Sequence, residues 1–208
     1  MAFDEMSGGT PGYGTDVRDS YRGLARWLAE AEDAEVGDRT AMTLATAGAD
    51  GRPDARIVLL KGAGPDGLTF FGDRRSTKGR QLAENPHAAL CFWWSELERQ
   101  VRVTGSVELI SPEESAAYFA VRPRESQLSA WTSIQSAVVP GREALDAAWQ
   151  ENERRFADQP VPLPPHWGGF RLRPDHFEFW QGRPGRFHDR IAYRRADSGA
   201  WIRERLSP

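Results

Sequence analysis

The stretch Phe177–Arg190 reads FEFWQGRPGRFHDR and decides how the rest of this chain is interpreted. It opens with aromatic residues and then places Arg186, His188 and Arg190 two residues apart, so that they share one face if the backbone is extended. A histidine between two arginines on one face is poor core material, and Trp180 offers a flat surface that can cover a ring. The stretch therefore predicts a binding site for an anion and an aromatic ring, although a charged surface hairpin would have the same composition.

Working outward, short strand patterns alternate with amphipathic helices. Strands are expected at residues 40–47, 54–61, 68–72, 87–94, 99–110, 168–173, 176–181, 190–195 and 200–206. Helices are expected at residues 19–32, 76–85, 111–123, 125–131 and 141–156. The expected caps are Asp19 or Ser20 for the first helix, Ser76 for the second, and a capping box of Ser111 and Glu114 for the third. Because a barrel removes the exposed edges of so many short strands, the expected fold is mainly β with peripheral helices.

Composition and charge narrow the classes of function. Lys and Arg number 27 and Asp and Glu 30, so the chain lacks the excess positive charge of a nucleic-acid-binding protein. No apolar run approaches the roughly 20 residues that span a bilayer, and residues 1–16 do not resemble a signal peptide. Cys91 is the single cysteine; it is consistent with a reducing cytoplasm and is expected to lie in the core. We expect a cytoplasmic protein with a flexible segment at residues 1–16 and one domain at residues 17–208.

Signatures of several common enzyme classes are missing from the sequence. His87, His166, His176 and His188 show no ligand spacing, so no metal site is expected. Neither the G-x-S-x-G pattern of α/β-hydrolases nor a G-x-G-x-x-G pattern after a strand is present.

Two segments before the middle of the chain carry donors for anionic groups. The run RIVLLK places a cation at each end of an apolar strand, Arg56 and Lys61, on opposite strand faces. The run STK at residues 76–78 begins a helix, where free backbone N–H groups and the helix dipole favour a phosphate. Taken alone, each segment is also consistent with polar ends that simply reach solvent.

Two later segments add polar groups. Gln100 shares a strand face with Arg102, and its amide can both donate and accept at the edge of a heterocycle. Tyr118, Arg122 and Ser126 follow at four-residue intervals and would share one face of a continuous helix, although Pro123 interrupts it. Their hydroxyl and guanidinium groups are suitable donors for a phosphate, and a solvated strand face or helix end remains the alternative.

These segments, in this order, resemble the pyridoxine/pyridoxamine 5′-phosphate oxidase family from about Thr40 to Pro208. FEFWQGRPGRFHDR matches the family's signature from end to end, and RIVLLKG, LERQV, YFAVRPRESQ, WTSIQSA and PPHWGGFRL support it. The resemblance implies a split β-barrel that binds FMN and forms a homodimer, with each active site built from both subunits. The implied substrate is a small molecule, pyridoxine or pyridoxamine 5′-phosphate. The implied reaction is hydride transfer from its C4′ to flavin N5, with reoxidation by O2 to give hydrogen peroxide.

The resemblance also implies roles for individual residues. The implied cofactor-binding residues are Arg56, Ile57, Val58, Leu59, Leu60, Lys61, Phe71, Gly72, Thr77, Lys78, Gln100, Gln135, Ser136, Trp180 and Arg190. The implied ligands of the substrate phosphate are Lys61, Tyr118, Arg122 and Ser126. Arg186 and His188 match residues over the substrate ring and are the expected catalytic residues, Arg186 through orientation and electrostatics and His188 through positioning or proton handling.

Three places depart from the family pattern. Thr77 stands where an arginine for the FMN phosphate is common, and Phe71-Gly72 replaces a more polar pair. Family members often carry an arginine-rich segment with a tyrosine that closes over the substrate, whereas GYGTDVRDSY here offers only Tyr13, Arg18 and Tyr21 and does not match it. Two alternatives are a related flavin oxidase acting on another ring system, such as a phenazine precursor, and a non-catalytic carrier of flavin or pyridoxal phosphate.

Overall fold

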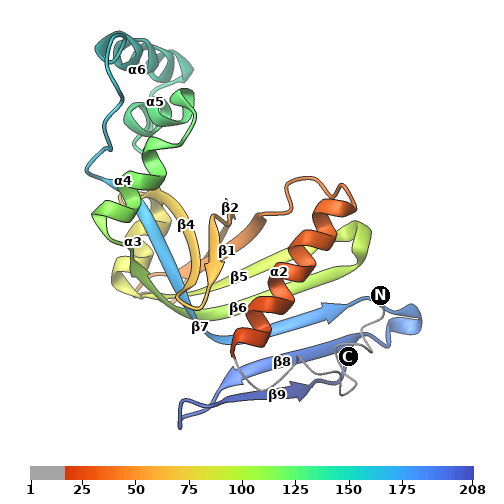
Figure 1. The fold of residues 1–208 in the computed structure, drawn as a ribbon. Coiled ribbons are helices and arrows are strands. Elements are labelled where there is room, and N and C mark those ends of the chain that lie inside the picture. Colours follow the sequence, from red (N-terminus) through yellow and green to blue (C-terminus); the bar gives the residue numbers. More distant parts are fainter. Residues whose placement is uncertain (1–16) are drawn as a thin grey trace.

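The computed structural model describes residues 17–208, in which nine antiparallel strands form one connected sheet (Figure 1). The strands are β1 (Ala41–Ala47), β2 (Pro53–Leu59), β3 (Gly62–Gly64), β4 (Gly67–Asp73), β5 (His87–Trp94), β6 (Arg99–Leu109), β7 (Trp167–Gln181), β8 (Asp189–Arg195) and β9 (Trp201–Arg205). Their order is β2-β1-β5-β6-β7-β4-β3, and β8 pairs with both β7 and β9. Because β2 also lies against β4 without a ladder between them in the described part of the chain, the sheet curls into a barrel with one open seam. The flexible segment expected at residues 1–16 lies outside the described residues.

The long strand β7 connects the two parts of the sheet. Its first half pairs with β4 and its second half with β8, while β6 runs along its other edge. We expected two separate strands, at residues 168–173 and 176–181, and this was wrong, because β7 runs through Pro174 without a break. Pro174 sits at a bulge opposite Gly105, where a missing ladder hydrogen bond is tolerated. A Cβ at Gly105 would lie 2.0 Å from the carbonyl oxygen of Arg173, so only glycine permits this close approach of the two backbones.

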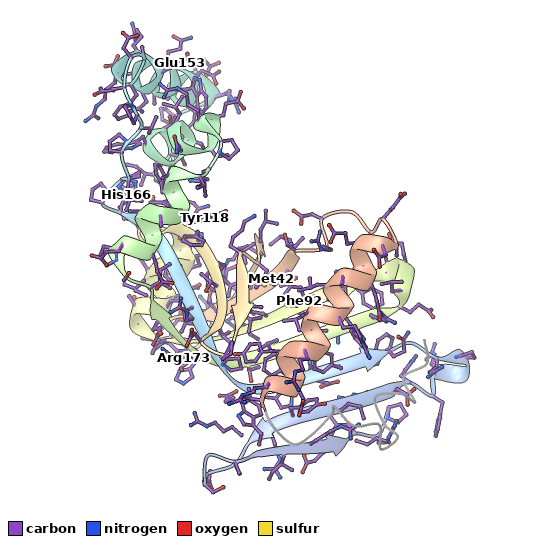
Figure 2. All side chains as sticks on the ribbon, in the orientation of Figure 1. Met42, Phe92, Tyr118, Glu153, His166 and Arg173 are labelled. Carbon is purple, nitrogen blue, oxygen red and sulfur yellow. The ribbon has the colours of Figure 1, made fainter. Side chains whose placement is uncertain are left out.

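Helix α2 (Val17–Asp33) covers one face of the barrel (Figure 1). Trp27 meets Phe179 edge to face at 5.3 Å between ring centroids, and Figure 2 shows Met42 and Phe92 beneath the helix. The helix is present as expected, but the expected cap at Asp19 or Ser20 was wrong. Both residues lie inside the first turn, where the hydroxyl of Ser20 donates to a backbone carbonyl of the same turn.

The other helices gather at the opposite end of the molecule (Figure 1). They are α3 (Thr77–Glu84), α4 (Pro112–Ala120), α5 (Arg124–Thr132) and α6 (Arg142–Arg155). Ser76 and Ser111 cap α3 and α4 through bonds to the third residue of each helix, which confirms both expected caps. A second apolar cluster, which includes Phe119, Leu128 and Trp167, fixes α4, α5 and α6 to the start of β7.

The sheet face opposite the main core is exposed. The residues that alternate with buried Leu90 and Phe92 point to this face, where Trp93 is 53% exposed. Cys91 was expected in the core, and that was wrong, because the same alternation turns it outward, half-buried, between Thr43 and Arg102. Within residues 17–208, no helix has the length and apolar character needed to cross a membrane.

Candidate active site

A pocket of about 360 Å³ occupies the open seam between β2 and β4, and we call it the β2–β4 pocket. The start of α3, the end of α4, α5 and the first residue of β7 complete its walls. The predicted site residues that line it are Arg56, Ile57, Val58, Leu59, Lys61, Phe71, Gly72, Lys78, Tyr118, Arg122 and Gln135. One chain therefore brings together residues predicted for both the cofactor and the substrate.

Strand β2 supplies an apolar wall. Alternation turns Ile57 and Leu59 outward, and they are 64% and 36% exposed, although both are apolar. Arg56 and Val58 point inward and are half-buried, whereas Leu60, predicted to contact the cofactor, is buried in the core and does not line the pocket. Exposed branched side chains at a pocket wall suit contact with a flat ring better than contact with water.

At the start of α3 the pocket contains a buried cation. Lys78 is only 6% exposed, and its ammonium group bonds to Ser76 Oγ at 3.2 Å and Gln135 Oε1 at 2.5 Å, both uncharged acceptors. Burial, and secondly the charge of Arg56, lowers the pKa of Lys78 to about 8, against an opposing effect of Asp73. A buried ammonium group with neutral acceptors is stabilised when an anion arrives.

The loop between α5 and α6 packs against this helix start. The backbone N–H of Thr77 donates to Ser136 Oγ at 3.3 Å, and Ser136 adopts a left-handed φ of 72°. Thr77 itself is not among the lining residues, but Arg80 donates to its hydroxyl at 3.4 Å, so a guanidinium group still lies next to this position. The start of α3 thus combines backbone N–H groups, hydroxyls and cations, which is the donor set of a phosphate site.

Elsewhere in the pocket, Arg122 lies over an aromatic ring. Its guanidinium carbon is 4.6 Å from the ring centroid of Trp167, and its buried Nη1 makes no hydrogen bond. Burial lowers the pKa of Arg122, while the neighbouring Tyr118 has the opposite effect. Tyr118, at the end of α4, stacks on Phe71 with 4.0 Å between centroids, beside β4 as Figure 2 shows. A buried donor without a partner inside a pocket fits an anionic ligand.

Ser126 is not among the lining residues. Helix α4 ends at Ala120, and Pro123 precedes the new helix α5, so the shared helical face does not form. Ser129 of α5 and Ser133, which directly follows that helix, line the pocket instead. They follow Ser126 at helical spacing, which is the sequence signal that would have found them.

The remaining predicted residues form a second group, which we call the Trp180 cluster: Gln100, Trp180, Arg186, His188 and Arg190. Gln100, Trp180 and Arg190 are neighbours across β6, β7 and β8. The ring of His188 lies 4.5 Å from that of Trp180, and its Nδ1 accepts a hydrogen bond from the backbone N–H of Arg183 at 3.2 Å. Arg186 is exposed and has a left-handed φ of 61°, a strained conformation often found at functional sites.

The Trp180 cluster and the β2–β4 pocket lie at opposite ends of β7 (Figure 1). The 15 residues of this strand span about 45–50 Å at about 3.3 Å per residue. No residue of the Trp180 cluster is among the residues that line the β2–β4 pocket. Within one chain, therefore, the two groups of predicted residues are not brought together.

A buried carboxylate lies beside the Trp180 cluster. Glu178 is 2% exposed and accepts hydrogen bonds from Arg190 Nε at 2.8 Å and Arg102 Nη2 at 2.7 Å. Burial alone would raise the pKa of Glu178, but the bond from Arg190 and the two positive charges outweigh it and hold the pKa below its usual value. Glu178 therefore fixes Arg190 in a defined position on the exposed sheet face.

Some pocket residues were not assigned a role from the sequence. Trp167 and Asp73 line the pocket, and their backbones pair at the edge between β7 and β4. Trp167 belongs to the segment PPHWGGFRL, which supported the family resemblance but did not indicate a role for the tryptophan ring. Asp73 is bound by Arg75, and no sequence pattern distinguishes it from a surface carboxylate.

Comparison with known proteins defines the class. The family described as pyridoxamine 5′-phosphate oxidase matches residues 28–154, and the pyridoxine 5′-phosphate oxidase C-terminal dimerisation region matches residues 167–208. A solved structure of PhzG from Burkholderia lata 383, in complex with tetrahydrophenazine-1-carboxylic acid, superposes with a TM-score of 0.88 at 31% identity, covering 96% of this chain and 97% of that one. A pyridoxamine 5′-phosphate oxidase-related, FMN-binding protein from Nostoc punctiforme shares the fold, with a TM-score of 0.72 at 23% identity, covering 90% and 97%. The fold is thus the FMN-binding split barrel, as expected.

Curated relatives give the family. The pyridoxine/pyridoxamine 5′-phosphate oxidase of Cupriavidus necator is 55% identical over 195 residues, which cover 93% of this chain and 92% of that protein. That of Microcystis aeruginosa is 50% identical over 190 residues, covering 91% and 89%. The chain belongs to the pyridoxine/pyridoxamine 5′-phosphate oxidase family. It is an oxidoreductase of this family, FMN is the cofactor, and the matched dimerisation region, which contains β7, β8 and β9, indicates a homodimer.

The residues of the β2–β4 pocket fit FMN. Lys78 is a buried cation bonded only to neutral acceptors, and the start of α3 offers further donors for a phosphate. Ile57 and Leu59 present apolar surface that a ring can cover. Gly72 leaves room for the lysine side chain, because a Cβ there would lie 2.9 Å from Lys78 Cε.

Proposed function

We propose that this chain oxidises pyridoxine 5′-phosphate or pyridoxamine 5′-phosphate to pyridoxal 5′-phosphate, with reduction of O2 to hydrogen peroxide, in the vitamin B6 salvage of the cytoplasm. The observation that carries the proposal is the presence of two cation sets in one pocket. Lys78 and Arg56 form one set, and Arg122 and Lys61, from other elements, form the second. Two phosphorylated ligands, the cofactor and the substrate, each require such a set.

The first set serves the cofactor. Arg56, Lys78 and Gln135, together with Ser136 and the start of α3, hold the FMN phosphate. The apolar wall of β2 contacts the flavin ring, and its branched side chains exclude water from that side.

The second set serves the substrate. Lys61, Tyr118 and Arg122 hold the substrate phosphate, because they supply two cations and a phenol within the same pocket. Ser126, one helical turn before the lining residue Ser129, can join them. Binding through a remote phosphate fixes the ring relative to the cofactor and supplies the proximity that the reaction needs.

A second subunit completes the site. We place the Trp180 cluster of one subunit over the β2–β4 pocket of the other, because the two groups lie apart in one chain and β7 and β8 belong to the matched dimerisation region. In this arrangement Gln100, Trp180 and Arg190 contact the flavin, and Arg186 and His188 lie over the substrate ring. The exposed apolar side chains of Ile57 and Trp93 become covered.

FMN, when bound, would supply the two-electron acceptor for oxidation at substrate C4′ and the reactivity with O2. His188 accepts the N–H of Arg183 at Nδ1, which assigns its proton to Nε2. His188 is therefore suited to donate a hydrogen bond to the substrate rather than to remove a proton. The exposed guanidinium group of Arg186 contributes orientation and positive charge, and no residue needs to act as a covalent nucleophile.

The visible spectrum of the purified holoprotein tests this function. Anaerobic addition of pyridoxine 5′-phosphate should bleach the flavin absorbance, and later admission of air should restore it with release of hydrogen peroxide. An unchanged spectrum in protein that carries FMN would exclude oxidation of this substrate and leave the carrier function or oxidation of another ring system.

One observation favours a second candidate. PhzG, which was solved with a tetrahydrophenazine-1-carboxylic acid, has a very similar fold, so a phenazine precursor is an alternative substrate class. The higher identity to the curated pyridoxine/pyridoxamine 5′-phosphate oxidases favours the phosphorylated substrate. Arg122→Ala distinguishes the two, because a substrate without a phosphate should keep its KM in this variant.

A further inference from the structure

Trp167 is the point at which several walls of the β2–β4 pocket meet. It is 7% exposed, is the first residue of β7, and its backbone pairs with Asp73 of β4. Its ring lies 5.3 Å from that of Phe71 and 6.2 Å from that of Tyr118, with interplanar angles of 15° and 9°. One tryptophan thus fixes a residue of β4 and a residue of α4 relative to each other.

The same ring supports the guanidinium group of Arg122. The distance from the guanidinium carbon to the ring centroid is 4.6 Å, and a second ring, Phe119, lies at 5.6 Å. Both distances are within the range of a cation–π interaction. Arg122 follows the end of α4, so the residue that precedes Pro123 is held by aromatic faces and not by a regular helix.

Arg122 differs from other arginines of the chain in what holds it. Arg56 is paired with Asp54 at 2.5 Å, and Arg190 with Glu178 at 2.8 Å. Arg122 has no carboxylate within salt-bridge distance in the described part of the chain, and its buried Nη1 lacks a hydrogen-bond partner. A carboxylate would cancel much of the field of a guanidinium group, whereas an aromatic face holds the group and leaves its charge available to a ligand.

From these contacts we infer that Trp167 is a positioning residue for the substrate phosphate: its ring holds Arg122 and Tyr118 in place without neutralising Arg122. The inference rests on the proposed function, because it assigns the two residues to the phosphate of the same substrate. In this assignment Arg122 and Tyr118 contact the phosphate, and Trp167 acts through them. Its removal should therefore weaken binding of a phosphorylated substrate and leave the chemical step almost unchanged.

Two substitutions of Trp167 distinguish the effect of an aromatic ring face from the effect of side-chain volume. Trp167→Phe keeps an aromatic face, and Trp167→Leu keeps apolar volume but removes the face. In the holoenzyme, Trp167→Leu should raise the KM for pyridoxine 5′-phosphate roughly three- to thirty-fold, the range that one cation–π contact supplies. Its kcat should stay within about twofold, and Trp167→Phe should restore most of the KM.

Binding without turnover gives a second readout. The ligand 4-deoxypyridoxine 5′-phosphate lacks the C4′ oxygen and cannot be oxidised, so its Kd in the holoprotein reports binding alone. Trp167→Leu should weaken it by the same factor as the KM. The Kd of the unphosphorylated 4-deoxypyridoxine should be unchanged.

Trp27 provides a matched control. It is 1% exposed and also carries an arginine over its ring, Arg99 at 4.8 Å, but it belongs to α2 and faces the main core. Trp27→Phe should lower the melting temperature as a core substitution does, while the KM and the Kd of the phosphorylated analogue stay at wild-type values.

The outcomes distinguish the inference from the function on which it rests. Wild-type protein that neither oxidises pyridoxine 5′-phosphate nor binds its analogue would overturn the proposed function and this inference with it. If the wild type does both and Trp167→Leu matches it in KM and Kd, only the role of Trp167 is overturned. The same holds if Trp167→Leu loses affinity equally for the phosphorylated and unphosphorylated analogues, because that result indicates a purely structural role.

Discussion

The ammonium nitrogen of Lys78 lies 2.5 Å from the side-chain oxygen of Gln135, which joins the start of α3 to the loop between α5 and α6. The lysine is buried, its nearest hydrogen-bond acceptors are neutral, and its pKa is lowered to about 8. The charge of this residue therefore changes within an accessible pH range, and the affinity for a phosphate should change with it.

FMN affinity should depend on pH through Lys78. Below pH 8 the ammonium group is charged and attracts the phosphate; above pH 8 the free protein loses the proton, so the Kd for FMN should rise towards tenfold per pH unit. Titration of the apoprotein by flavin fluorescence between pH 7 and 9.5 measures this. Lys78→Arg should remove the inflection, because a guanidinium group stays charged.

Riboflavin is the matched ligand control for this titration. It lacks the phosphate, so its Kd should be flat across pH 8. An inflection of equal size with riboflavin would show that Lys78 does not bind the phosphate.

The same lysine should make the free energy of unfolding of the apoprotein increase as the pH rises from 8 to 10.5. In this range the unfolded chain still holds the proton, up to about pH 10.5, whereas the folded chain has lost it.

Gly72→Ala should weaken FMN binding without unfolding the chain. The new Cβ would lie 2.9 Å from Cε and 3.1 Å from Nζ of Lys78, so the lysine must move from its place beside Gln135. The loss of one charge-assisted hydrogen bond predicts roughly 10- to 100-fold weaker FMN binding. Gly62→Ala, whose Cβ would meet only the side chain of Thr69 at 3.8 Å, is the control and should bind FMN normally.

Glu178→Gln should destabilise the protein and loosen Arg190. The carboxylate is buried between Arg190 and Arg102, and both arginines keep contact with solvent, so a loss of about 1–3 kcal/mol is expected at neutral pH. Because the pKa of Glu178 is held below its usual value, its contribution to stability is present above about pH 4.5 and is lost as the pH falls through the folded-state pKa.

Thermal unfolding at several pH values checks this prediction. The difference between wild type and Glu178→Gln should shrink as the pH falls below about 4.5, since both side chains are then neutral. Glu204→Gln, which removes the exposed partner of Arg194, should change little at any pH. A constant difference between wild type and Glu178→Gln across this range would show that ionisation of Glu178 does not stabilise the fold.

Much of the fold could be predicted from the sequence because local patterns specify it. The strands predicted at residues 40–47 and 99–110, and the caps Ser76 and Ser111, were correct. The continuity of β7 could not be predicted, because Pro174 ends a strand in most contexts and is tolerated here only by the bulge opposite Gly105. Tyr21, named as one of three residues available for a lid, instead packs on Phe177 at 5.4 Å in the core; Tyr13 lies outside the described residues.

Site residues that belong to a local sequence motif could be predicted, whereas residues that only tertiary packing brings into the pocket could not. The two cations of RIVLLK and the helix start at residues 76–78 meet in the β2–β4 pocket. The helix break at Pro123 replaces Ser126 by Ser129 in the lining, and the contact of Trp167 with Arg122 joins residues that are far apart in sequence. The sequence contains no local pattern that predicts the separation of the Trp180 cluster from the β2–β4 pocket within one chain.

Subunit complementation tests this division of the site most directly. Arg122→Ala damages the β2–β4 pocket, and Arg186→Ala damages the Trp180 cluster. In a dimer of one chain of each kind, isolated through two different affinity tags, one site carries both defects and the other carries neither. At substrate concentrations below KM, oxidation of pyridoxine 5′-phosphate by the mixed dimer should recover to about half of the wild-type rate while each parent variant stays nearly inactive. A mixed dimer no more active than the average of its two parents would contradict a site shared between subunits.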